Sequence, residues 1–465
     1  MRRFLGLAWV LVPALCWGQP DTLWTRFYGD PGANESAYDL CLTADGGAAI
    51  AGYTYAGGVD MWMIRVDQNG DSLWSRRYGG SGNQYAYGID CNRDGGFVLC
   101  GYTEPYNTGP RNCYVVRTNA VGDTLWTREY GQDGENGDGA MSTHEAVDGG
   151  YFIGGKSQVS GYWLIRTDAQ GDTLWTRAFG PPDPWGCSEV RQTSDSGFIM
   201  AGGPFRAIRL DANGDSVWCH DYAYSSFDHC TAVRQTRDGG FVLAGSLGLM
   251  QHAFAIMRIK AAGDTLWTRT YQMGLYDICS NVCETADDGF MLAGNTAISD
   301  TSYDYAAVLL KVNGQGDSLW SLSYGSTGDH GFVSVCQMED RGYFAAGYGS
   351  AVAFGDEDMF LLKTAPDPER AQDHSSYRPS SISLSNFPNP FNSTTEIAFD
   401  LPKAGKVSLK VFDLLGREVA VVQEGMMAAG SHRVNFDGKD LASGVYVYRL
   451  QAGDAVQAKK MVSLK

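Results

Sequence analysis

The sequence predicts an all-β chain: a seven-bladed β-propeller followed by a small Ig-like β-sandwich. One observation is a motif of Asp, then Ser or Thr, then an aliphatic residue and a tryptophan. The motif recurs at Trp24, Trp74, Trp126, Trp175, Trp218, Trp267 and Trp320. A turn signal, Asp followed two residues later by Gly, keeps phase with it at Asp45, Asp94, Asp148, Asp195, Asp238, Asp287 and Asp340. Repeats of 40 to 50 residues that contain several short strands are typical of β-propellers.

The composition supports this fold class. Glycine is abundant at 59 residues, aromatic residues make up 12%, and charged residues only 19%. Such a chain is neither disordered nor a coiled coil. The 36 basic residues against 53 acidic ones give a net charge of −17, which argues against binding to nucleic acids or anionic membranes.

The first 18 residues have the pattern of a secretory signal peptide. Basic Arg2 and Arg3 precede the apolar run 4–17, and Gly18 is the expected last residue of the signal. We therefore expect the mature chain to leave the cytoplasm and to pass through the periplasm. The ten cysteines that remain could form disulfides there, although their shared repeat positions favour small buried side chains.

Each repeat of residues 19–364 is expected to form one four-stranded blade. In the second repeat the strands are 85–92, 96–103, 113–118 and 125–130. The connection after the Trp strand varies most in length, so we assign this strand to the outer edge of the blade. The chain then begins with an outermost strand, 22–28, and ends its repeats with a third strand, 358–364. We expect these two to pair and close the ring, which removes exposed sheet edges.

Two recurrent residue types have expected scaffold roles. The tryptophans should bury apolar area between adjacent blades. A basic residue recurs in the third strand, and we expect it to pair with the recurrent Asp of the next hairpin. These positions are Arg65, Arg117, Arg166, Arg209, Arg258, Lys311 and Lys363.

Residues 387–465 carry several short motifs in a fixed order. After a Pro- and Ser-containing linker, 365–386, come Phe387-Pro-Asn-Pro-Phe-Asn392, an alternating strand with Val407, Leu409 and Val411, and the end Lys459-Lys-Met-Val-Ser-Leu-Lys465. The region resembles the type IX secretion C-terminal sorting domain (Por secretion tail), whose fold is similar to the Ig-like domain of flagellar hook-capping proteins. The preceding repeats resemble bacterial seven-bladed propeller repeats, which share no activity.

The resemblance implies export through an outer-membrane machinery that reads the tail, to the cell surface or the medium, with or without removal of the tail. It assigns the sorting signal to Gly444, Tyr446, Tyr448, Arg449, Leu450, Lys460, Met461 and Lys465. Residues 387–465 hold 10 basic and 8 acidic residues, so the acidity belongs to the propeller.

No catalytic or metal-ligating motif is visible, and neither a cofactor nor a metal site is predicted. Function should lie where the repeats differ, on the face of the variable loops. Aromatic candidates for a ligand there are Trp185, Tyr85, Tyr87, Tyr222, Tyr224 and Tyr276. The interpretation favoured is a noncatalytic binding or adhesion module for a glycan or a protein. An extracellular polysaccharide hydrolase or lyase, or a structural spacer, are the alternatives.

Overall fold

The computed structural model describes two units separately, Met1–Pro368 and Glu369–Lys465. The described residues run from 20 to 463. Within this span the gaps are 31, 105–110, 132–136, 158–160, 182–185, 224, 226–227, 249–251, 299–303, 326–327, 351–356, 368–382, 388–393, 402, 404, 414–415, 428–429, 440 and 454. The predicted signal peptide lies outside the described residues.

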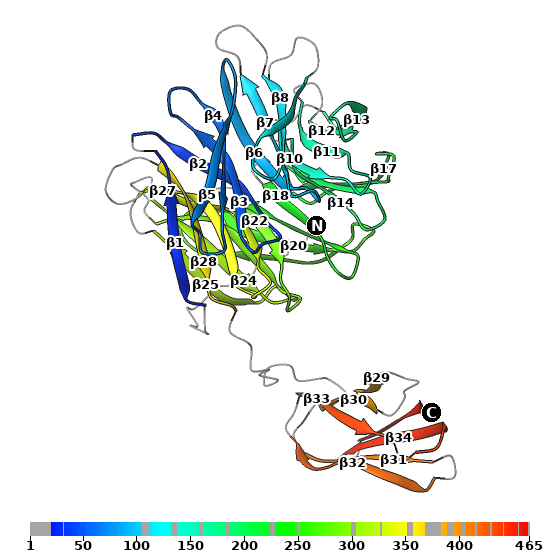
Figure 1. Cartoon of the computed structure of the whole chain (residues 1–465). Helices are drawn as coiled ribbons and strands as arrows, with labels where there is room; N and C mark the ends of the chain where they lie inside the picture. Colours follow the sequence, from blue (N-terminus) through cyan, green and yellow to red (C-terminus); the bar gives the residue numbers. More distant parts are fainter. Residues whose placement is uncertain are drawn as a thin grey trace, which may run out of the picture. The chain divides into compact units, whose positions relative to one another are not determined.

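The first unit contains seven four-stranded antiparallel sheets in its described residues (Figure 1). Blade 1 is β2 (Glu35–Leu42), β3 (Ala48–Thr54), β4 (Asp60–Val66) and β5 (Ser72–Tyr78). Blade 2 is β6 (Asn83–Cys91), β7 (Phe97–Glu104), β8 (Asn112–Thr118) and β9 (Thr124–Tyr130). Blade 3 is β10 (Gly139–Glu145), β11 (Tyr151–Lys156), β12 (Tyr162–Thr167) and β13 (Thr173–Phe179). Blade 4 is β14 (Cys187–Gln192), β15 (Phe198–Gly202), β16 (Arg206–Leu210) and β17 (Ser216–Asp221).

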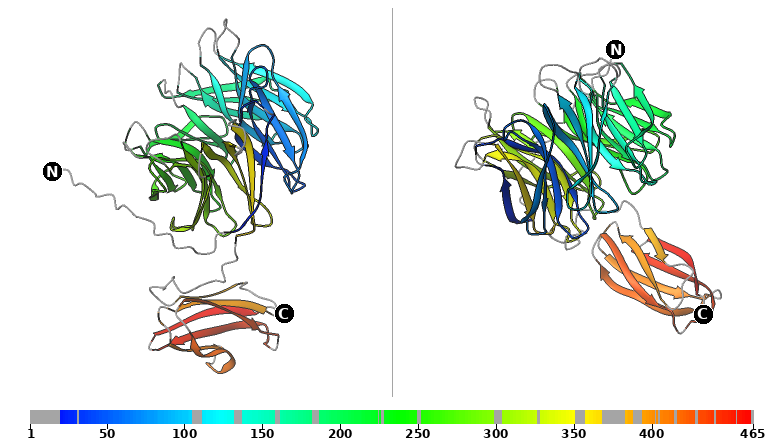
Figure 2. Two further views of the ribbon diagram at one scale, coloured as in Figure 1. Left: turned by 90° about the vertical axis from the view of Figure 1, so that its left-hand side faces the viewer. Right: turned by 45° about the horizontal axis from the view of Figure 1, so that its top comes forward.

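The remaining blades repeat the same order. Blade 5 is β18 (His229–Gln235), β19 (Phe241–Leu247), β20 (Ala253–Ile259) and β21 (Thr265–Tyr271). Blade 6 is β22 (Asp277–Glu284), β23 (Phe290–Ala297), β24 (Tyr305–Val312) and β25 (Ser318–Tyr324). Blade 7 takes three strands from the end of the repeats, β26 (His330–Gln337), β27 (Tyr343–Ser350) and β28 (Glu357–Thr364). Figure 2 shows the blades arranged around a common axis, as in a β-propeller.

The fourth strand of blade 7 is β1 (Thr22–Tyr28), from the front of the chain. It runs antiparallel to β28, with Thr22 opposite Thr364 and Tyr28 opposite Met359. Figure 1 shows the dark blue β1 beside the yellow β28. The predicted closure of the ring is confirmed.

The tryptophans lie between adjacent blades, as predicted. Trp74 of blade 1 packs edge-on against Phe97 of blade 2, with ring centroids 5.9 Å apart. The same indole covers Gly122, where a Cβ atom would come within 2.8 Å of the ring. Gly122 also has a φ of +83°, so the turn and the indole both require glycine there. Trp320 is buried, whereas the other six are half-buried.

The recurrent ion pair has a different partner from the one predicted. In blade 1, Arg65 on β4 binds Asp45 in the turn between β2 and β3 of the same blade, at 2.5 Å. The same pairing within one blade recurs in the other six. The side chain reaches the turn because β4 lies next to β3 in the sheet, so the prediction of a bond to the next hairpin is wrong.

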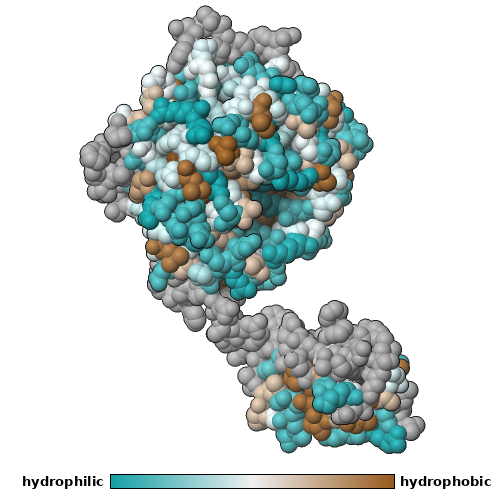
Figure 3. Space-filling model, viewed as in Figure 1, coloured by the Kyte–Doolittle hydropathy of each residue, from teal (hydrophilic) through white to brown (hydrophobic). Residues whose placement is uncertain are grey.

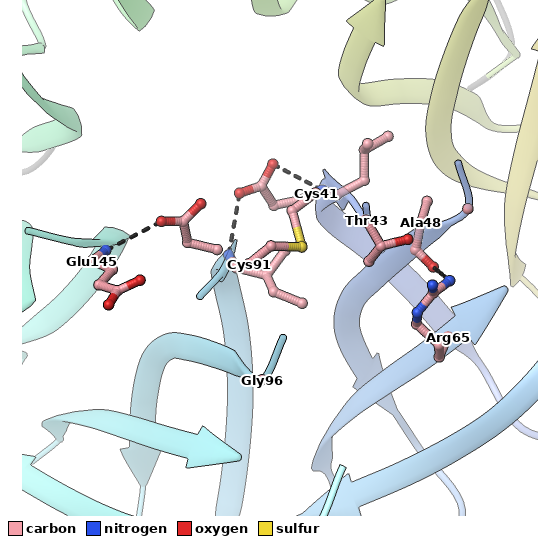
Figure 4. The surroundings of a disulfide bond; sticks show 12 residues. Cys41, Thr43, Ala48, Arg65, Cys91, Gly96 and Glu145 are labelled. Carbon is pink, nitrogen blue, oxygen red and sulfur yellow. Dashed lines mark hydrogen bonds between the residues drawn. A yellow bond between two sulfur atoms is a disulfide. The ribbon is translucent and has the colours of Figure 1, made fainter. Parts of the chain in front are cut away.

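Polar side chains also join neighbouring blades at the end of the inner strand. In blade 4 the backbone N–H of Ser194 donates to the side-chain oxygen of Gln235 in blade 5, at 2.8 Å. Equivalent bonds connect Arg93 with Glu145, Val147 with Gln192, Arg237 with Glu284, and Ala286 with Gln337. Between blades 1 and 2 the equivalent residue is Cys91, which forms a disulfide with Cys41 (Figure 4).

Most of the other described cysteines have the small buried side chain that their repeat positions predicted. Cys187, Cys230 and Cys279 occupy one position and are fully buried. Cys283 and Cys336 share the position of Cys41 and are half-buried thiols. The disulfide is therefore an exception within a set of structural thiols.

The second unit is a β-sandwich. One sheet has the order β29 (Ser383–Phe387), β30 (Thr394–Leu401), β33 (Gly430–Asp437), and the other the order β32 (Glu418–Met427), β31 (Gly405–Phe412), β34 (Gly444–Ala452), β35 (Ala455–Ser463). Its core contains Phe399, Phe436, Leu409, Tyr448 and Met461, drawn from both sheets. The predicted linker, 365–386, is shorter at both ends. Asp367 still binds Trp320 and Tyr343 of the propeller, and β29 begins at Ser383.

Candidate functional site

Two of the predicted aromatic residues, Tyr85 and Tyr87 on β6, lie in a cluster of six tyrosines. The other members come from blades 1 and 2 and are Tyr38, Tyr53, Tyr55 and Tyr102. We call these six residues the tyrosine surface. Tyr38 and Tyr87 are the extra residues of β-bulges at the same position of two adjacent inner strands. A bulge re-aims its side chain out of the regular alternation.

The six rings form a continuous chain of contacts. Tyr38 meets Tyr87 at 4.5 Å and Tyr53 at 5.9 Å between ring centroids. Tyr53 meets Tyr55 at 5.5 Å and Tyr85 at 5.1 Å. Tyr102 closes the set, at 4.8 Å from Tyr85 and 5.6 Å from Tyr87. These separations are those of favourable aromatic pairs.

The outer part of the cluster is open to solvent. Tyr55 is 49% exposed, and its hydroxyl lies 3.3 Å from that of Tyr85. Tyr55 lies just after β3, in the connection to β4, and Tyr85 lies near the start of β6, just after the connection from β5. Both connections are among those whose length varies between repeats. The tyrosine surface thus lies on the predicted loop face.

The buried hydroxyl groups of this surface are uncharged at neutral pH. Burial raises the pKa of Tyr53 and of Tyr87 to about 12, so both hydroxyls keep their protons at neutral pH. The guanidinium of Arg111 lies over Tyr102, 4.1 Å from the ring centroid. Its charge is balanced by Glu104, 3.5 Å away.

Two of the other predicted aromatic residues, Tyr222 and Tyr276, do not join this cluster. The Tyr222 hydroxyl donates to the carbonyl oxygen of Gly263 at 2.7 Å. Tyrosines at the ends of four other Trp strands make the same bond to the next blade, so Tyr222 belongs to the scaffold. Tyr276 packs on His252 at 4.5 Å, in blades 5 and 6. Trp185 and Tyr224 lie outside the described residues.

Sequence reasoning missed Tyr38, Tyr53, Tyr55 and Tyr102. A signal was present, because Tyr53 and Tyr102 both follow the recurrent glycine of their repeats, and Tyr38 and Tyr87 share another position. Adjacent blades with tyrosine at both positions bring the rings together. Comparing repeats column by column would have found the cluster.

A groove between blades 2 and 3 is lined by Arg117, Trp126 and Tyr151, among others. These residues are engaged in the repeat scaffold: Arg117 donates to the Tyr151 hydroxyl at 2.6 Å, and Trp126 donates to the carbonyl of Ala169 at 3.2 Å. In the part of the chain that the structure describes, no three His, Cys, Asp or Glu side chains are grouped to hold a metal ion. The described residues also contain no helix long and apolar enough to span a membrane.

The predicted sorting residues divide into two sets. Tyr446, Tyr448 and Leu450 on β34, and Met461 on β35, point into the sandwich and are buried. Gly444, Arg449 and Lys460 are exposed. Lys465 lies outside the described residues.

Residues 385–464 match the family described as secretion system C-terminal sorting domain. This segment is a C-terminal sorting domain. Sorting domains direct a chain through the secretion machinery, so this protein is exported to the cell surface or secreted. The predicted resemblance and localisation are confirmed. The sorting domain lies within the second unit. The propeller is the part of the chain that is exported with it.

No curated protein matches the chain. Among solved structures, the extracellular domain of the putative hybrid two component system BT3049 from B. thetaiotaomicron is 10% identical, with a TM-score of 0.44 over 92% of this chain and 55% of that one. PorZ of Porphyromonas gingivalis, an essential bacterial surface component of the type-IX secretion system, is 9% identical, with a TM-score of 0.36 over 96% and 75%. The Pan2 WD40 domain of Neurospora crassa is 9% identical, with a TM-score of 0.49 over 77% and 98%.

Proposed function

We propose that this exported propeller is a noncatalytic glycan-binding protein, and that the tyrosine surface is its binding site. The single observation that carries the proposal is the chain of six tyrosine rings on the loop face. A tyrosine offers an apolar ring face and a hydroxyl that can donate and accept. The faces of sugar rings stack on the first, and sugar hydroxyl groups bond to the second.

The electrostatics favour a neutral glycan. Arg111, which stacks on Tyr102, is paired with Glu104, so the surface offers no unpaired cation from this pair to attract an acidic sugar. The chain as a whole carries a net charge of −17, which repels polyanions at low salt. A protein partner, the other ligand that the sequence leaves open, would also use tyrosines as anchors.

The test measures binding and hydrolysis together on the full chain. A glycan array with neutral and uronic-acid polysaccharides is expected to give binding to neutral chains, with no release of reducing sugar. Release would overturn the noncatalytic assignment in favour of a hydrolase, and binding to protein ligands alone would overturn the glycan assignment.

Two single variants test whether the ligand binds at the tyrosine surface. Tyr85→Ala should weaken binding at least tenfold, because it removes the ring that contacts Tyr53 and Tyr102. The matched control is Tyr276→Ala, a partly exposed tyrosine of blade 6 that packs on His252 instead. A loss with Tyr276→Ala and none with Tyr85→Ala would move the site away from the tyrosine surface.

A further inference from the structure

The outer face of the sheet β32-β31-β34-β35 combines cationic and apolar side chains. Side chains alternate along each strand, so the buried Tyr446, Tyr448 and Leu450 place Val445, Val447 and Arg449 on the opposite side. Residues opposite them in the neighbouring strands share that side. They are Lys410 opposite Arg449, Phe412 opposite Val447, and Lys460 opposite Val447 on the other edge. We call this set, with Val421 opposite Lys410, the outer sorting face.

A like-charge pair lies at its centre. Lys410 and Arg449 are direct cross-strand neighbours, an arrangement that destabilises a sheet. Each is partly compensated: Lys410 binds Glu418 at 2.9 Å, and Arg449 lies over the Phe412 ring at 4.7 Å. Lys460 is diagonal to Arg449 and adds a third cation. A sequence that keeps this arrangement on an exposed sheet loses stability for it, which points to a use outside the fold.

Apolar side chains are exposed next to these cations. Val421 is 50% exposed and Val456 is 53% exposed, and Val445 and Met426 are exposed as well. Val456 lies opposite Gln451 and Met426 lies opposite Lys406, both on the same side of the sheet as Arg449. In Figure 3 the described surface of this unit carries brown apolar groups beside teal hydrophilic ones.

We infer that the outer sorting face is the surface that the secretion machinery contacts, and that its partner presents carboxylates beside apolar side chains. Arg449 and Lys410 bind the carboxylates of the partner, and the valines and Phe412 pack against its apolar side chains. The inward residues Tyr446, Tyr448, Leu450 and Met461 act only by holding the sandwich together. This divides the predicted sorting residues into a recognition set and a folding set, and it is independent of the tyrosine surface.

One substitution separates recognition from stability. Arg449→Glu replaces the like-charge pair by an opposite-charge pair with Lys410, so the sandwich should be as stable or slightly more stable. In cells that carry the secretion route, export of the full chain should fall at least tenfold, with retention in the periplasm. Arg449→Lys should restore most of the export. The matched control is Lys403→Glu, the same change of charge at an exposed lysine between β30 and β31.

Two measurements accompany export. Thermal unfolding of each purified variant tests stability, and Tyr448→Ala should lose export only together with its melting transition. A photo-crosslinking residue at Val421 identifies what covers the face. Normal export of Arg449→Glu, or an export defect that follows a lowered melting temperature, would overturn the inference. So would crosslinks confined to the chain's own propeller or to a second copy.

Discussion

Lys311 donates from Nζ to both carboxylate oxygens of Asp287, at 2.8 and 3.0 Å. Its side chain is only 1% exposed, the most buried of the seven repeated cations. It also donates to the Thr285 hydroxyl and to the carbonyl of Val312. The pair holds the first turn of blade 6 against its third strand.

Asp287→Ala should lower the free energy of unfolding by about 2–3 kcal/mol. The variant leaves a buried ammonium without its carboxylate, a change that typically costs about 3–5 kcal/mol. The expected loss of about 2–3 kcal/mol is below this range, because the Asp287 side chain is half exposed and water can take over part of its interaction with Lys311. Urea unfolding measures the difference. An Asp287→Ala/Lys311→Met double variant should regain part of the loss, and a larger loss in the double variant would contradict the argument.

The propeller should lose stability in acid because Glu189 becomes protonated. Burial alone would raise its pKa, but the charges of Arg234 and Arg191 hold the pKa at about 2, below the ordinary 4.5. A carboxyl group whose pKa is lower in the folded than in the unfolded state stabilises the fold at a pH above its unfolded-state pKa. This stabilisation is lost as the pH falls through the folded-state pKa. Between about pH 4.5 and pH 2 the propeller should therefore lose about 3 kcal/mol from this group. Glu189→Gln should flatten this part of a stability–pH curve, and an unchanged slope would contradict the prediction.

The disulfide between Cys41 and Cys91 should stabilise the contact of blades 1 and 2. It closes a loop with a sequence separation of 50 residues, for which the loss of unfolded-chain entropy gives about 4 kcal/mol. The Cys41→Ser/Cys91→Ser variant should unfold at a lower denaturant concentration. Cys219→Ser, at the exposed thiol of blade 4, is the control and should change nothing. Equal stability of both variants would show that the bridge does not form.

Removing 22–28 should leave the propeller open. Without β1, the backbone of β28 has an unpaired edge in blade 7, and Phe27 no longer packs on Phe360, 5.6 Å away. Exposed edges pair with other chains, so the shortened chain should aggregate at concentrations where the parent is monodisperse in light scattering. Leu23→Ser, at an exposed position of the same strand, should leave the particle size unchanged. Monodisperse behaviour of the shortened chain would show that closure is dispensable.

Ligand binding at the tyrosine surface should not depend on pH between about pH 7 and pH 9, below the range in which a free tyrosine, with a pKa of about 10, ionises. Burial keeps Tyr53 and Tyr87 protonated beyond that point, with pKa values of about 12. Isothermal titration with the glycan found by the array, at several pH values, measures this. A drop in affinity near pH 7 would instead indicate a histidine or carboxylate in the site.

The repeat spacing was sufficient to predict the number of blades, the order of strands and the closure by 22–28. These features are local or periodic, because a turn residue, an alternating strand and a tryptophan repeat in phase. The seven in-phase repeats give the number of blades, and the position of the variable connection gives the order of strands within each blade. The order of the C-terminal motifs is likewise sufficient to identify the sorting domain from the sequence. In each case neighbouring residues in the sequence carried the whole signal.

Tertiary structure alone decided which side chains meet. Arg65 pairs with Asp45 of its own blade rather than with the Asp of the next hairpin, because the adjacency of β4 and β3 in the sheet brings the two side chains together. Tyr222 and Tyr85 occupy different repeat positions, and only the coordinates show that the Tyr222 hydroxyl bonds to Gly263 whereas the Tyr85 ring contacts Tyr53. Likewise, the alternation of β34 separates buried Tyr448 from exposed Arg449. Contacts between blades and between strands depend on a closed ring and a packed sandwich, whose distances no local pattern encodes.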